Sequence, residues 1–144
     1  MRKVPIILVV VILFSWFLYS QNKWQAEIDK VGLEDLNLQL IGVVDSVDNG
    51  DNYHGYGIIR LRIISSNLQE YDPRSKQEFY FCIIKNGKAE IYEHTFVSKV
   101  DTVTIDTKKK IISYIENGRR GVGSISINAD KSYYNYIRRK TIFK

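Results

Sequence analysis

The sequence predicts an all-β domain, mainly antiparallel, that follows an N-terminal apolar helix. Between residues 36 and 127, short runs of alternating apolar and polar residues are separated by turn-forming segments. The chain also has 10 tyrosines and only 2 prolines, a composition typical of strands. We therefore expect residues 36–144 to form a small coiled β-barrel or sandwich of about seven strands.

Residues 1–20 hold the most apolar segment of the chain. Residues 4–19 carry no charge, and 12 of them are Val, Ile, Leu or Phe. At roughly −0.3 to −0.6 kcal/mol each, these side chains favour membrane insertion by about 4–7 kcal/mol. As a helix the segment would be about 24 Å long, which fits a short single-pass anchor or a long signal-peptide core.

The flanking residues predict the orientation of this segment. Arg2 and Lys3 precede it, so the positive-inside rule keeps the N-terminus in the cytoplasm and places the domain outside. Ser20 supplies a small residue at only one of the two positions that signal-peptide cleavage requires. The alternatives are a domain anchored in an inner membrane through residues 4–19, and a secreted or periplasmic domain released by cleavage before Gln21.

Residues 21–35 are expected to form a helical neck between the apolar segment and the domain. Trp24, Ile28 and Val31 recur at helical spacing, and Gly32 is the expected end of the helix. The alternative for this region is a flexible tether.

The charges of the exported part are unevenly distributed. After residue 20 the chain carries 19 basic and 16 acidic residues, but residues 81–144 alone hold 13 basic and 6 acidic ones. This pattern indicates self-complementarity, a basic face toward an anionic surface, or two ordinary solvated faces. The only cysteine is Cys82, so packing has to stabilise the domain without an internal disulfide.

The first predicted strand is long and bent. Leu36, Leu38 and Leu40 alternate with polar residues, and the apolar positions change parity at Ile41 beside Gly42. Glycine is common where a strand bulges or changes face. A bent first strand is a feature of small closed barrels and resembles an oligonucleotide/oligosaccharide-binding (OB) barrel in outline.

The next segments combine a turn with possible ligand groups. Three aspartates within residues 45–51 form a solvated turn or, as an alternative, a calcium site. In the following strand Ile59, Leu61 and Ile63 are expected to face inward. Arg60 and Arg62 then face outward, as a clamp for a carboxylate or phosphate or as a solvated face.

A β-hairpin over residues 78–94 is the clearest local prediction. Asn86-Gly87 between two apolar runs favours a type I′ turn that pairs Lys85 with Lys88. One face of the hairpin is assigned to the core and holds Cys82, Ile84, Ala89 and Ile91. The other face is an aromatic strip that either stacks on a sugar or base or packs beneath a helix or loop. This strip consists of Phe79, Phe81, Ile83, Glu90, Tyr92 and His94.

Three further strands are expected between residues 101 and 127, with basic turns between them. Together with Arg60 and Arg62, the basic residues of these turns are candidates for binding an anionic ligand. They are Lys108, Lys109, Lys110, Arg119 and Arg120.

The tail, residues 130–144, fits two structures. As a helix capped near Asp130, it places Tyr133, Tyr134 and Ile137 on one face. As a strand, it alternates its tyrosines between two faces. Its basic and aromatic residues suit a membrane interface or a nucleic-acid backbone, and the alternative is an element that closes the barrel.

The chain contains no phosphate-binding glycine loop, no G-x-S-x-G, no H-E-x-x-H and no C-x-x-C pair. We therefore expect a non-catalytic binding module of the cell envelope, without cofactor or bound metal, whose partner is an envelope protein or polymer. The alternatives are a nucleic-acid- or oligosaccharide-binding barrel, although export makes nucleic acid an improbable partner, and an exported hydrolase or calcium-binding protein.

Overall fold

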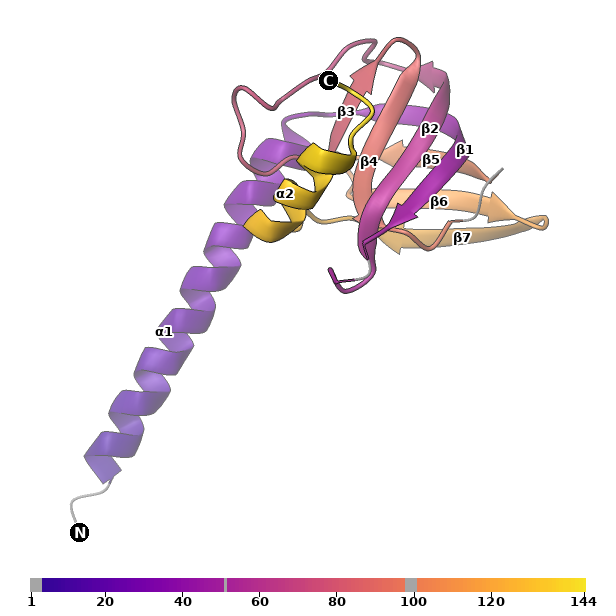
Figure 1. Ribbon diagram of the computed structural model, residues 1–144. Helices are drawn as coiled ribbons and strands as arrows, with labels where there is room; N and C mark the ends of the chain where they lie inside the picture. The colour runs from indigo at the N-terminus through magenta and orange to yellow at the C-terminus, as the bar shows by residue number, and fades with distance from the viewer. Residues whose placement is uncertain (1–3, 51, 98–100) are drawn as a thin grey trace.

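A computed structural model describes residues 4–50, 52–97 and 101–144 (Figure 1). Seven strands form one antiparallel sheet in the order β3-β4-β2-β1-β5-β6-β7. An all-β antiparallel domain that follows an N-terminal apolar helix was predicted, and this prediction is confirmed. The strands are β1 (Gln39–Asn49), β2 (Tyr56–Ser66), β3 (Cys82–Lys85), β4 (Lys88–His94), β5 (Thr102–Asp106), β6 (Ile111–Glu116) and β7 (Arg119–Ser124).

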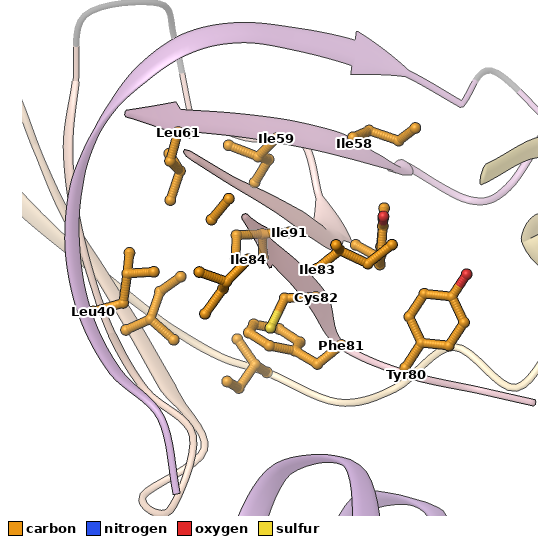
Figure 2. Close-up of a cluster of buried hydrophobic side chains, with 14 of the residues drawn as sticks. Leu40, Ile58, Ile59, Leu61, Tyr80, Phe81, Cys82, Ile83, Ile84 and Ile91 are labelled. Carbon is orange, nitrogen blue, oxygen red and sulfur yellow. The ribbon is translucent and has the colours of Figure 1, made fainter. Parts of the chain in front are cut away.

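The sheet is open and sandwich-like. Among the described strands, β3 and β7 lie at opposite edges of the sheet and do not pair with each other. Strand β1 curves strongly, so that the two halves of the sheet enclose a common inner face (Figure 2). The barrel alternative, with its OB-like closed outline, is therefore wrong for the described residues.

The inner face of the sheet holds the hydrophobic core. Figure 2 shows Leu40, Leu61, Ile84 and Ile91 directed into the same space from different strands. Val103, Ile105 and Ile112 add aliphatic side chains from the other half of the sheet, and all seven are buried. Burial also raises the pKa of the Cys82 thiol, so this cysteine is an inert core residue, as predicted.

The predicted hairpin has the predicted register. Lys85 pairs with Lys88 and Cys82 pairs with Ile91. Asn86 and Gly87 both have positive φ values, 54° and 72°, which a type I′ turn requires. The pairing is shorter than predicted, because β3 begins only at Cys82.

The predicted change of parity at Gly42 is wrong. The pairing of β1 with β2 is irregular at this position, as expected for a bulge. However, Leu38, Leu40, Gly42 and Val44 are all buried and continue on one face, whereas Ile41 is exposed. The exposed aliphatic residues of this strand thus belong to the outer face.

Helix α2 (Lys131–Lys140) covers one half of the outer face. Asp130 caps the helix by accepting a hydrogen bond from the Ser132 N–H, so the helical alternative for the tail is confirmed. Its tyrosines reach β2 and the segment before β3: Tyr133 donates to the Gly57 carbonyl at 2.6 Å and Tyr134 to the Tyr80 carbonyl at 2.7 Å. The helix therefore lies over β2, β3 and β4, between the sheet and the end of α1 (Figure 1).

Helix α1 (Val4–Asp29) runs without interruption from the apolar segment into the neck and continues as the π-helical turn η1 (Lys30–Glu34). Gly32 does not end the helix, contrary to the prediction. A Cβ at Gly32 would lie 2.0 Å from Ile127 Cδ1, so glycine permits close contact between the neck and the chain after β7. The neck is thereby docked on the domain and is not a flexible tether.

The apolar part of α1 projects away from the domain (Figure 1). Within the described residues, one helix, Ile6–Glu34, is long and apolar enough to cross a membrane, and its most apolar window is not buried in the protein. This length and composition fit a signal anchor and a signal peptide equally.

Candidate functional site

The aromatic strip of the hairpin is not a free binding surface. Phe81 and Tyr92 are buried. Phe79 is partly buried, with its ring between Trp24 and Tyr134, and His94 lies against Tyr56 at a ring-centroid distance of 3.9 Å. Other parts of the chain therefore cover these side chains, with Tyr134 of α2 against Phe79 and Tyr56 of β2 against His94.

Glu90, within this strip, is the centre of a buried polar cluster. Its side chain has no exposed area, and four donors surround its carboxylate. Arg60 Nε donates to Oε1 at 3.0 Å, as does the Ile142 N–H at 3.1 Å. Tyr92 and Thr141 donate their hydroxyls to Oε2, at 3.0 and 2.5 Å. The cluster therefore joins β2 and β4 to the end of the tail.

Arg60 is consequently engaged inside the protein and is not available as one half of an arginine clamp. Besides Glu90, it donates to the Lys140 carbonyl at 2.9 Å and lies 3.8 Å from the Asp48 carboxylate. Arg62, in contrast, is exposed and pairs with Lys88 across the strands. The two arginines therefore have different roles.

Neither of the described helices α1 and α2 lies over the other half of the outer face (Figure 1). The registers of β1, β5, β6 and β7 place three rows of side chains on this side. One row runs from Val43 through Thr102 and Ile115 to Arg120, and the next from Ile41 through Thr104 and Ser113 to Val122. We call this surface the open face and define it by the residues of these two rows and of a third, Gln39, Asp106, Ile111 and Ser124.

The open face combines exposed aliphatic side chains with small hydroxyl residues. Ile115 and Val122 are 55% and 61% exposed, and Ile41 and Ile111 are exposed to a lesser degree. Contiguous aliphatic groups on a protein surface are typical of a site that another macromolecule covers. Strand β7, at the border of this surface, is an edge strand of the sheet.

Basic residues lie at both ends of the first row. The registers continue this row from Val43 to Arg62 and Lys88 on one side, and it ends at Arg120 on the other. Lys88, Arg62 and Arg120 are exposed. Two of the predicted binding residues, Arg62 and Arg120, thus flank the open face.

The remaining predicted basic residues do not join this surface as one patch. Arg119 pairs with Glu116 on the opposite side of the hairpin, and Lys108–Lys110 lie at the other end of β6. Lys109 forms an ion pair with Asp106 at 3.2 Å, and Lys110 forms one with Glu34 at 2.9 Å. The geometry therefore gives no support to a continuous nucleic-acid interface.

The acidic turn also has a structural role. Asp48 accepts a hydrogen bond from the Tyr136 hydroxyl at 2.6 Å and faces Arg60. Asp51, another member of the predicted calcium set, lies outside the described residues. Within the described ranges, no group of three or more His, Cys, Asp or Glu residues is arranged to hold a metal ion.

Glu93 is a second buried carboxylate, and within the described residues its hydrogen-bond donors are backbone N–H groups. It accepts hydrogen bonds from the backbone N–H groups of His94 (2.8 Å) and Ser126 (3.3 Å). Burial raises its pKa to about 7, the N–H donors oppose this shift, and the nearby Asp29 adds to it. Since the ionised form is disfavoured in the folded protein, Glu93 reduces stability as the pH rises.

We expect Glu93→Gln to remove this pH dependence. In the wild type, Glu93 contributes fully to the free energy of unfolding below the ordinary carboxyl pKa of about 4.5. This contribution is lost as the pH rises through about 7, and the loss amounts to about 3 kcal/mol. Denaturant titrations of both proteins at pH 4.5 and pH 8 would measure it. The free energy of unfolding of the variant should exceed that of the wild type at pH 8 but not at pH 4.5. An equal difference between the two proteins at both pH values would contradict the raised pKa of Glu93.

Comparison with known proteins gives no relative from which to assign this site: no family model, curated protein or solved structure matches the chain.

Proposed function

We propose that the protein is a non-catalytic interaction module, anchored in an inner membrane through α1, with its β domain outside the cytoplasm. Its open face would bind an envelope protein. Support for the anchor comes from the exposed apolar half of α1 and from Arg2 and Lys3 before it.

The binding proposal rests on the contrast between the two halves of the outer face, the one over β2–β4 and the one formed by β1, β5, β6 and β7. The half over β2–β4 is covered by α2 and by the Glu90 cluster. The half that includes Ile115 and Val122 leaves aliphatic side chains exposed to solvent. Covering such a side chain contributes up to about 1.5–3 kcal/mol, so a partner on this face would gain binding energy from it.

The charges around the open face indicate the chemistry of the partner. Arg62, Lys88 and Arg120 flank the aliphatic row, so a complementary protein surface would place acidic residues around an apolar centre. Phe81 and Tyr92 of the aromatic strip are buried and cannot stack on a sugar, which favours a protein over an envelope polymer.

A photo-crosslinking residue at position 122 in the full-length, membrane-bound chain tests this proposal. We expect a discrete crosslinked product, and we expect Arg120→Glu to reduce its yield about tenfold, since like charges would then face each other. The adjacent substitution Arg119→Glu is the matched control. It makes the same change of charge on the opposite side of the strand and should leave the yield unchanged.

The second variant pair tests the aliphatic contribution. Ile115→Asp should abolish the product, whereas Ile64→Asp, at a side chain 63% exposed on β2, should not. Equal yields from the two aspartate variants, or no product at position 122, would overturn the assignment of the open face.

A further inference from the structure

An apolar stripe continues along α1 from the membrane segment into the neck. Phe17, Trp24 and Val31 are seven residues apart, with Gln21 and Ile28 between them at spacings of four and three. Trp24 and Val31 are 46% and 49% exposed, although the neck around them is otherwise polar on its solvent side. Alternating spacings of three and four residues are typical of a seam between two parallel helices.

The stripe also forms one wall of a groove. Trp24, Glu27, Ile28 and Val31 line a hollow of about 300 Å³ together with the segment Lys76–Phe79, and the Trp24 ring contacts the Phe79 ring edge-on. The helix is fixed beside this hollow, because Gln25 donates to the Ile127 carbonyl at 2.9 Å and Asp29 accepts from the Ile127 N–H at 2.9 Å. The groove is therefore a feature of the docked neck and not of a mobile tether.

We infer that this groove and stripe bind the α1 helix of a second copy of the chain, in a parallel symmetric dimer. This inference rests on the proposed membrane anchoring, which aligns both copies with their N-termini on the same side. A two-fold axis along the membrane normal keeps both anchors in the bilayer, and a seam along α1 has that direction. Gln21 of each copy would meet its equivalent at the membrane edge, where a polar pair fixes the register.

Charge complementarity supports this occupant. Lys76 lies on the loop wall of the groove. On α1, the spacing of about 100° per residue places Glu27 at the edge of the stripe, on the side of Trp24 away from Ile28. Neither side chain belongs to an ion pair with another described residue of its own chain. In a parallel two-fold dimer, the left edge of the stripe on one helix lies against the right edge of the stripe on the second helix. Lys76 of each chain would therefore face Glu27 of the second copy.

Disulfide crosslinking in membranes tests the dimer directly. In the full-length chain, Val31→Cys should give a covalent dimer on oxidation, and Lys30→Cys, at the neighbouring exposed position outside the stripe, should give at least fivefold less. Wild type is the background control, since Cys82 is buried. Equal yields at positions 30 and 31, or no dimer at position 31, would overturn the inference.

A charge exchange keeps the test independent of any single variant. In the Val31→Cys background, Glu27→Lys should lower the dimer yield severalfold, and adding Lys76→Glu should restore it. Failure of the pair to restore the yield would contradict the proposed contact.

Sedimentation of the same samples separates the anchor proposal from the dimer proposal. A chain that crosslinks at position 31 without sedimenting with membranes would refute the anchor. A chain that sediments with membranes without the crosslink would refute the dimer.

Discussion

Replacing Glu90 by alanine is expected to lower the free energy of unfolding by about 3–5 kcal/mol, the usual cost of removing one partner from a buried ion pair. The substitution leaves Arg60 without its buried partner and leaves the Tyr92 and Thr141 hydroxyls and the Ile142 N–H without an acceptor. Thermal denaturation of the full-length protein in detergent should show a midpoint lower by roughly 15 °C or more.

The control for this prediction is Glu78→Ala. Glu78 also forms an ion pair, with Lys131 at 3.0 Å, but both side chains are exposed. An exposed pair contributes about 0–1 kcal/mol, so the control should change the midpoint only slightly. A similar small change for Glu90→Ala would show that the cluster does not hold the C-terminal tail on the sheet.

The double substitution Val9→Arg with Leu13→Arg is expected to prevent membrane insertion. Each arginine near the centre of an inserting helix costs about 2.5–3.5 kcal/mol and also removes an apolar residue, so the pair costs about 6–8 kcal/mol. That exceeds or cancels the roughly 4–7 kcal/mol that the segment supplies. After fractionation of expressing cells, the variant should be found in the soluble cytoplasmic fraction.

Val9→Leu with Leu13→Ile is the matched control, because it changes the same two positions and keeps them apolar. Both residues are exposed on α1, so neither pair of substitutions alters the packing of the β domain. Unchanged membrane association of the arginine variant would mean that something other than α1 attaches the protein to the membrane.

Local signals in the sequence were sufficient to predict several elements. Asn86-Gly87 permits positive φ at both turn positions, which fixes the hairpin register without any distant contact. Asp130 marks the start of α2 because its carboxylate satisfies a free N–H of the first turn. The number of strands followed from the turns between alternating runs.

The covering of the outer face could not be predicted in the same way. Alternation assigns side chains to two faces of a sheet but does not say which face another element covers. The Glu90 cluster depends on Thr141 and Ile142, which follow Glu90 by more than 50 residues. The sequence pattern therefore predicts a binding surface at a strip in which Glu90 holds the C-terminal tail and Phe79 packs against α2.

The sequence does not predict the open face, because an aliphatic residue in a strand is expected to point toward the core. The aliphatic side chain of Ile41 is what predicts a change of parity beside Gly42. In the structure Ile41 stays on the outer face with Ile115 and Val122. The signal that could have indicated this surface is the excess of aliphatic residues at positions where regular alternation requires polar ones.

The measurement that tests the central claim most directly is protease digestion of intact spheroplasts from a bacterial host that express the wild-type chain with an epitope after Lys144. A membrane-anchored module with an exported domain predicts that the tagged chain sediments with membranes at its full mass and that external protease removes the tag, while a cytoplasmic marker stays intact. A tag that is protected until the membrane is lysed, or a tagged chain that is soluble in the cytoplasm, would contradict the account.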